Sequence, residues 1–188
     1  MRNKKPLDWK DYAILVGIII FLGLLVWSQT AFAKSFTGRV IDVYDGDTVR
    51  VVQPDPKGGC SWIHKIRLRG VDSPERSQSY GKAARQFVRN LLFGRKIFIK
   101  ASPTKRDRWG RIIADICWSG GKNPYKCLSY QLIRAGLAWH YKAYDKDKRL
   151  SRAEMSARKA KRGLWSQAKP EAPWLYRRRR KSTKGHGR

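Results

Sequence analysis

Acidic residues are scarce in this chain. Asp and Glu together number 14 among 188 residues, against 42 Lys and Arg, and the formal net charge is +28. This imbalance argues against a cationic partner, because the field of the chain attracts polyanions and raises their local concentration. Nucleic acid and an anionic membrane surface are the two partners that fit, and charge alone does not choose between them. The length suits one domain with appendages.

Cysteine is rare as well. The chain has Cys60, Cys117 and Cys127, and their spacing does not resemble that of a zinc site. An oxidising compartment permits one disulfide and leaves one thiol over. Cys117 and Cys127 flank a short loop containing Gly, Asn and Pro, so they are the favoured pair. Unpaired thiols are the alternative interpretation.

Long apolar runs are absent except near the N-terminus. The run from Ala13 to Trp27 is shorter than the roughly 20 residues that span a bilayer. Cations precede it and Ala31-Phe32-Ala33 follows it, which is the pattern of a secretory signal. We predict cleavage after Ala33 and a periplasmic or secreted protein. The alternative is an uncleaved anchor helix that holds residues 13–33 in the inner membrane, with the remainder facing outside the cytoplasm.

No internal repeats occur, and the remaining sequence reads as strands followed by helices. Alternating and β-branched residues predict strands over Phe36–Val43, Thr48–Gln53, Trp62–Leu68, Lys96–Lys100 and Arg111–Trp118. Helical stripes and stop signals predict helices over Tyr80–Phe93, from Asn123 to Gly136, and over Asp147–Arg162, with Leu164-Trp165 folding back onto the core. Five strands with a small helical complement predict an α+β domain built on a Greek-key β-barrel.

The C-terminal segment changes in composition. We divide the chain into residues 1–33, the signal or anchor; 34–168, the folded domain; and 169–188, a basic tail. Lys169 to Pro173 is a linker, and Arg177 to Lys181 is an unbroken cationic run. Such a composition predicts a disordered, polyelectrolyte arm.

Five ionic residues have the chemistry that phosphodiester hydrolysis needs. Asp47 and Asp72 lie at strand ends beside turns, where their carboxylates can converge on a hard cation such as calcium rather than zinc. Glu75 lies in a loop and is the candidate general base. Arg67 and Arg111 lie on predicted strands, and an arginine fork suits two phosphoryl oxygens. Taken singly, each acid has a competing interpretation as a turn or surface residue.

Two other groups of residues bear on the site. Asp45, which precedes glycine, is read as a turn residue rather than a ligand. Exposed aromatic side chains can stack on bases, which contributes about 1–3 kcal/mol per base without sequence preference. The candidates for nucleic-acid binding are Trp109, Tyr141 and Tyr144, together with Arg177, Arg178, Arg179 and Arg180.

Several segments resemble the staphylococcal nuclease (thermonuclease) family. The likeness covers about Ser35 to Gln167, and its segments follow one another in the same order. The active-site segments are Tyr44–Val49, Ile66–Glu75 and Asp107–Arg111, and the later ones are Leu132–Ala138 and Gly163–Ser166.

The resemblance implies a five-stranded barrel of the oligonucleotide-binding (OB) type with three helices, and a calcium-dependent phosphodiesterase. It implies that Asp47, Asp72 and the main-chain carbonyl of Ser73 bind calcium. Glu75 is then the base, while Arg67 and Arg111 steady the five-coordinate phosphorus. Family members cut DNA and RNA at the 5′ P–O bond and leave 3′-phosphate ends. We therefore expect a monomeric endonuclease with little sequence preference that favours single strands.

The chain departs from the best-known member in three places. Ser73 replaces the usual threonine, the loop from Arg76 to Ser79 is short, and Pro54 to Cys60 is an insertion. These differences concern substrate preference more than chemistry. Two alternatives belong to the binding class: a catalytically silent domain that only holds nucleic acid, and a membrane-tethered adaptor that uses the basic run of the tail.

Overall fold

The structure is a computed structural model that describes residues 8, 12, 35–102, 106–118 and 122–185. It divides into two compact units, Met1–Phe32 and Ala33–Arg188. The predicted signal or anchor lies outside the described residues apart from Asp8 and Tyr12. Within the described residues, we find no helix with the length and apolarity that a membrane crossing requires.

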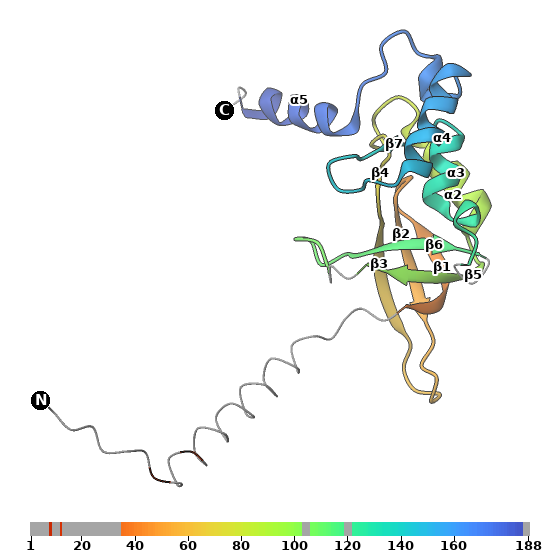
Figure 1. Ribbon diagram of the computed structural model, residues 1–188, viewed down its shortest axis with the longest axis vertical. Coiled ribbons are helices and arrows are strands. Elements are labelled where there is room, and N and C mark those ends of the chain that lie inside the picture. Colours follow the sequence, from red (N-terminus) through yellow and green to blue (C-terminus); the bar gives the residue numbers. More distant parts are fainter. Residues whose placement is uncertain (1–7, 9–11, 13–34, 103–105, 119–121, 186–188) are drawn as a thin grey trace, which may run out of the picture. The chain divides into compact units, whose positions relative to one another are not determined.

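A closed β-barrel forms the centre of the larger unit (Figure 1). Its strand order is β1-β2-β3-β6-β5, in which β3 and β6 are parallel and the other neighbours antiparallel. The strands are β1 (Phe36–Val43), β2 (Thr48–Gln53), β3 (Trp62–Leu68), β5 (Lys96–Ala101) and β6 (Ile112–Cys117). Val49 and Val51 of β2 and Ile66 and Leu68 of β3 alternate with outward residues and are buried. The predicted five-stranded barrel is confirmed.

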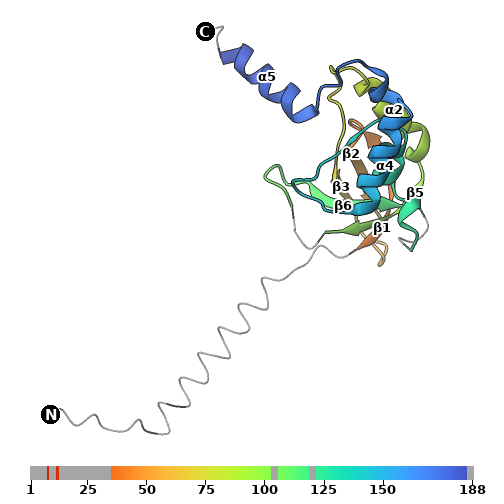
Figure 2. The same ribbon diagram turned by 45° about the horizontal axis from the view of Figure 1, so that its top comes forward.

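Three helices gather at one end of the barrel (Figures 1 and 2). They are α2 (Gly81–Leu92), α3 (Leu128–Arg134) and α4 (Lys148–Lys159). α2 packs on β1, whereas α3 packs on β6 and on α4. The 3₁₀ turn η2 (Gly163–Ser166) buries Leu164 and Trp165, as the sequence predicts.

The second predicted helix is divided in two. Asn123 caps the 3₁₀ helix η1 (Pro124–Lys126) by accepting a hydrogen bond from the Tyr125 backbone N–H, and α3 begins at Leu128. Cys127 lies between them in an extended conformation and pairs with Cys117 both in a β-bridge and in a disulfide. That crosslink holds the chain against β6 and prevents one continuous helix. Cys60 is an exposed free thiol.

Two very short strands, β4 (Val71–Asp72) and β7 (Trp139–His140), form a separate antiparallel pair. The sequence did not predict them, because two residues are too few to show a period. In this pair Asp72 lies opposite Trp139. The pair fixes a candidate metal ligand against the segment that follows α3.

The tail differs from the prediction of disorder, because it forms α5 (Pro173–Gly185). Proline suits the first turn of a helix. Ala172 and Pro173 are buried, and Trp174 packs edge-on against Trp139 with ring centroids 5.5 Å apart. Tertiary contacts therefore order a segment whose composition alone indicates disorder.

The disulfide gives the first prediction. Cys117→Ser should lower the free energy of unfolding by about 2–3 kcal/mol, because the crosslink closes a loop of 10 residues and restricts the unfolded chain. Urea unfolding of the full chain without reductant measures the change, and reductant should remove the difference from the parent protein. Cys60→Ser is the control and should unfold like the parent. Equal midpoints for all three proteins would contradict a stabilising crosslink.

Candidate active site

The turn between β1 and β2 positions Asp47. The Asp47 backbone N–H donates to Asp45 Oδ1 at 3.0 Å, so Asp45 has the turn role that its place before glycine suggests. A side chain at Gly46 would collide with Ser73, which shows how closely the turn packs on the Asp72-Ser73 segment. Burial raises the pKa of Asp45 above its ordinary value, against the opposing field of Arg67.

Arg67 joins the two predicted metal ligands. It lies on β3 opposite Thr48, and its guanidinium forms an ion pair with the carboxylate of Asp47. The Nη2 atom of Arg67 lies 2.7 Å from Asp72 Oδ1. The side chains of Asp47 and Asp72 are 2% and 0% exposed, so both carboxylates depend on such partners for their charge. Asp47 Oδ2 also accepts the Ser73 backbone N–H at 2.7 Å.

Arg111 reaches the same group of residues through Thr48. Its Nη1 donates to Thr48 Oγ1 at 3.3 Å, and that hydroxyl donates to Asp47 Oδ1 at 3.1 Å. Asp107 holds Arg111 from the other side, since its Oδ2 accepts from Arg111 Nε at 2.7 Å. The sequence missed both Thr48 and Asp107 as site residues. Asp107 could have been found from the sequence, because it begins the Asp107–Arg111 segment that resembles the family and lies four residues before Arg111.

Hydrogen bonds also set the protonation of Asp107. Partial burial disfavours its charged form, but hydrogen bonds from Arg111 and from the Trp109 backbone outweigh that effect. They hold the pKa of Asp107 below its ordinary value. Asp107 therefore orients Arg111 as a carboxylate throughout the neutral range.

Glu75 lies at the open edge of the site, with its side chain 35% exposed. The start of α2 packs on its main chain, because a side chain at Gly81 would collide with the Glu75 carbonyl oxygen. Glu75 Oε1 accepts from Arg177 Nη1 at 2.8 Å. Glu75 is thus close to Asp72 through a shared partner, and it remains open enough to meet water.

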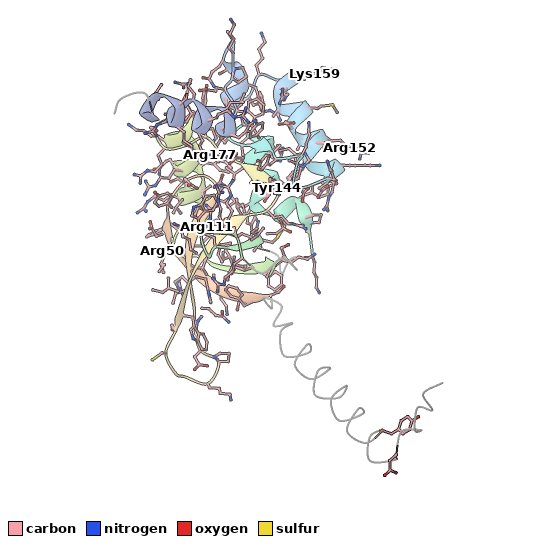
Figure 3. The ribbon with its side chains drawn as sticks, turned by 90° about the vertical axis from the view of Figure 1, so that its left-hand side faces the viewer. Arg50, Arg111, Tyr144, Arg152, Lys159 and Arg177 are labelled. Carbon is pink, nitrogen blue, oxygen red and sulfur yellow. A yellow bond between two sulfur atoms is a disulfide. The ribbon has the colours of Figure 1, made fainter. Side chains whose placement is uncertain are left out.

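Arg177 enters the site from α5. Its Nη2 lies 2.7 Å from Asp72 Oδ2, and its Nη1 lies 3.2 Å from Asp72 Oδ1. Burial disfavours its charge, but the hydrogen bonds to Asp72 and Glu75 outweigh this and raise the pKa of Arg177 above its ordinary value. Figure 3 shows Arg177 and Arg111 on the same face, with Tyr144 beside them. The sequence predicted Arg177 only as a nucleic-acid contact of a disordered arm.

The predicted stacking residues differ in how open they are. Trp109 is 64% exposed beside Arg111, whose guanidinium carbon lies 4.9 Å from the ring centroid. Tyr144 is 79% exposed. Tyr141, by contrast, is covered by Trp174, with ring centroids 5.2 Å apart and an interplanar angle of 11°. Tyr144 is therefore the most open of the three rings, whereas Trp109 is exposed but has the guanidinium groups of Arg108 and Arg111 over its ring.

The other arginines of the predicted tail site also lie on α5. Arg179 forms an ion pair with Glu171 at 3.0 Å, and Arg180 donates to Ser77 Oγ at 3.1 Å. Arg178 is exposed. These residues lie near the active site but do not enter it.

The donor chemistry fits a hard cation. Asp47 and Asp72 present carboxylate oxygens, and the latter already binds positive charge with both of its oxygens. Across the described part of the chain, no group of three or more His, Cys, Asp or Glu side chains is arranged to hold a metal ion. Calcium takes six to eight oxygen ligands. A calcium ion held by these two carboxylates would therefore need main-chain, water and substrate oxygens to complete its shell.

The comparisons with known proteins agree with this geometry. Residues 65–167 match the family described as Staphylococcal nuclease homologue. The chain is 35% identical over 159 residues to an uncharacterized endonuclease of Escherichia coli, an alignment that covers 85% of this chain and 96% of that protein. It is 27% identical over 176 residues to a micrococcal nuclease of Shigella flexneri, covering 90% and 93% of the two chains.

A plant protein is similar over a shorter stretch. The staphylococcal-like nuclease CAN1 of Arabidopsis thaliana is 38% identical over 117 residues, which are 62% of this chain and 34% of that protein. Barrel, ionic network and relatives agree: the chain belongs to the staphylococcal nuclease family and is a nuclease, a hydrolase of phosphodiester bonds.

Proposed function

We propose that the protein is a calcium-dependent endonuclease that cuts DNA and RNA with little sequence preference and leaves 3′-phosphate ends. The observation that carries the proposal is the single network that joins Asp47, Arg67 and Asp72, with Arg111 linked to it through Thr48. This is a set of anionic ligands and cationic phosphate-binding groups at one point of the barrel.

Each residue has a role that its surroundings allow. Asp47, Asp72 and the Ser73 carbonyl would hold calcium, which supplies Lewis-acid polarisation of a phosphoryl oxygen when bound. Arg67 and Arg111 donate to phosphoryl oxygens and offset the charge that develops there. Glu75, partly exposed at the edge of the site, takes a proton from the attacking water.

The open rings and the positive charge favour flexible, single-stranded substrates. Trp109 and Tyr144 offer exposed faces for stacking, which every base can use. Phosphate contacts supply affinity without reading the sequence. We therefore propose weak sequence preference and steep inhibition by salt.

We also propose that the enzyme acts as a monomer outside the cytoplasm. The N-terminal charge and apolar run support export, and the disulfide between Cys117 and Cys127 suits an oxidising compartment. Cleavage after Ala33 would release the enzyme, whereas retention would leave it anchored to the inner membrane. The intact ionic network argues against the catalytically silent alternative.

Arg111→Ala tests the catalytic assignment. The variant should lose roughly 10²–10³-fold in kcat, because one donor to the charged transition state is removed. Cleavage of single-stranded DNA, plasmid and RNA is measured with calcium and with chelator, and the parent should be active only with calcium. Arg152→Ala is the matched control, since Arg152 is exposed on α4 and points away from Arg111 (Figure 3).

Two results would overturn this proposal. Digestion by the parent that is equal in calcium and in chelator would rule out the metal requirement. A rate for Arg111→Ala equal to that of Arg152→Ala would remove Arg111 from the mechanism.

Asp107→Asn tests how Arg111 is oriented. At neutral pH the variant keeps Arg111 but loses its charged partner, so kcat should fall roughly tenfold to a hundredfold. The folded-state pKa of Asp107 is below its ordinary value of 3.8, so the ion pair stabilises the fold above that value and is lost as pH falls through the folded-state pKa.

The difference in urea midpoint between parent and Asp107→Asn should therefore be full at pH 6 and vanish at strongly acidic pH. Asp55→Asn is the control, because Asp55 lies in the loop before β3 and its carboxylate bonds only the backbone of Lys57 among the contacts of the described residues. If the difference in urea midpoint between parent and Asp107→Asn is the same at low pH, the charge of Asp107 does not contribute to stability.

A further inference from the structure

One helix covers two parts of the active site at once. Arg177 of α5 binds both oxygens of Asp72 and one oxygen of Glu75, and Trp174 of the same helix is stacked on Tyr141. The covered groups are the candidate metal ligand, the candidate base and a candidate stacking ring. They come from two separate segments of the chain and are covered by two side chains of α5, so a chance contact of one side chain does not account for the arrangement.

Arg177 supplies the positive charge that the carboxylates lack. Asp47, Asp72 and Glu75 carry three negative charges, and Arg67 contacts only the first two. Asp72 is fully buried, so it cannot rely on solvent to stabilise its charge. A divalent cation would bring charge of the same sign to the same oxygens. Arg177 and the cation are therefore alternative partners of Asp72.

Trp174 occupies the surface that a base would use. Its ring is nearly parallel to that of Tyr141, at 11° and 5.2 Å, which is the geometry of stacking between flat rings. Tyr144 lies next to Tyr141, with centroids 4.8 Å apart, and is open. A nucleic acid that uses both tyrosines must displace Trp174 from one of them.

The attachment of α5 combines polar contacts with the apolar packing of Pro173 and Trp174. Neither hydrophobic cluster of the described residues includes a residue of α5. Besides the contacts of Arg177 and Trp174 with the site, Trp174 packs edge-on against Trp139, and Arg179 forms an ion pair with Glu171. Hydrogen bonds also join the helix to the loop before α2: Tyr176 Oη lies 3.0 Å from Ser77 Oγ, and Arg180 donates to the same hydroxyl. Leu175, in the first turn of α5, is 48% exposed. Displacement of the helix would therefore remove contacts at the edge of the core and no residue of either cluster.

We propose that α5 is an intramolecular cap on the active site, which a divalent cation displaces from Asp72 and a single-stranded nucleic acid displaces from Tyr141. The proposal rests on the proposed function for the identity of the two competitors. Closed, the cap neutralises the carboxylates; open, it exposes them together with the stacking ring. The consecutive arginines of α5 give a polyanion a direct means of drawing the helix away.

Arg177→Gln in the full-length chain tests the competition for the cation. Calcium binding is measured by titration calorimetry without nucleic acid, against the parent and against Lys181→Gln. The control removes the same charge one turn further along α5, from an exposed residue. If the cap is closed in about nine molecules of ten, its loss should raise the apparent affinity about tenfold, because only the open fraction binds. An affinity equal to that of the control, or a weaker one, overturns the cap.

Trp174→Ala tests the competition for the stacking ring. Binding of a short single-stranded oligonucleotide is measured with chelator present, so that neither calcium nor cleavage contributes. The variant keeps every charge but frees Tyr141, and its affinity should rise severalfold over the parent. Weaker binding would show that Trp174 is itself a base-binding ring and would overturn the cap. Circular dichroism and urea unfolding check that the barrel is intact.

The two sets of results separate the cap from the proposed function. If no protein cleaves in calcium, the proposed function fails, while the oligonucleotide measurement in chelator still decides whether α5 competes for Tyr141. If the parent cleaves in calcium, but Arg177→Gln binds calcium no better than Lys181→Gln and Trp174→Ala binds the oligonucleotide no better than the parent, the function stands and the cap is wrong.

Discussion

Two carboxylates buried next to each other are the constraint around which this site is built. Asp47 and Asp72 have almost no exposure to water, and their charges repel unless a cation lies between them. Arg67 meets that requirement from the end of β3, while the turn after β1 and the pair of β4 with β7 deliver the two acids. The barrel thus brings together strand ends that are distant in sequence and holds opposite charges there. Removing Arg67 would leave Asp47, among the described residues, with only the hydroxyl of Thr48 and the Ser73 backbone N–H as hydrogen-bond donors, and Asp72 with Arg177.

The strong positive charge of the chain has two distinct effects. On the surface it gathers a polyanionic substrate, which does not depend on where each arginine lies. Inside the site it acts through defined contacts, since Arg67, Arg111 and Arg177 each bond a named oxygen. Only the second effect depends on geometry. Net charge could therefore suggest the class of partner, whereas the identity of the arginines that matter required the motifs and then the structure.

The sequence predicted those parts of the fold that local patterns encode. The bounds of β1, β2 and β3 agree with the predicted strands, because alternating apolar residues in β2 and β3 face the core. It failed where distant contacts decide the conformation. Cys127 interrupts a predicted helix because it is crosslinked to Cys117, and β4 has only two residues and exists through its pairing with β7. The sequence favoured the pairing of Cys127 with Cys117, but helix propensity does not show that this pairing interrupts the helix, and nothing local indicates that β4 pairs with β7.

The conformation of the tail at the active site could not be predicted from the sequence for the same reason. A run of arginines is expected to repel itself and remain disordered, and this holds as long as its counter-charges are unknown. Arg177 meets Asp72 across 105 residues of sequence and Arg179 meets Glu171 nearby, so the structure supplies carboxylates that the pattern could not reveal. Those carboxylates are the same groups that the proposed cation requires. Attraction of substrate requires only exposed positive charge and no contact with these carboxylates. Because α5 does contact them, the proposed cap links the ordering of this helix to the exposure of the active-site carboxylates.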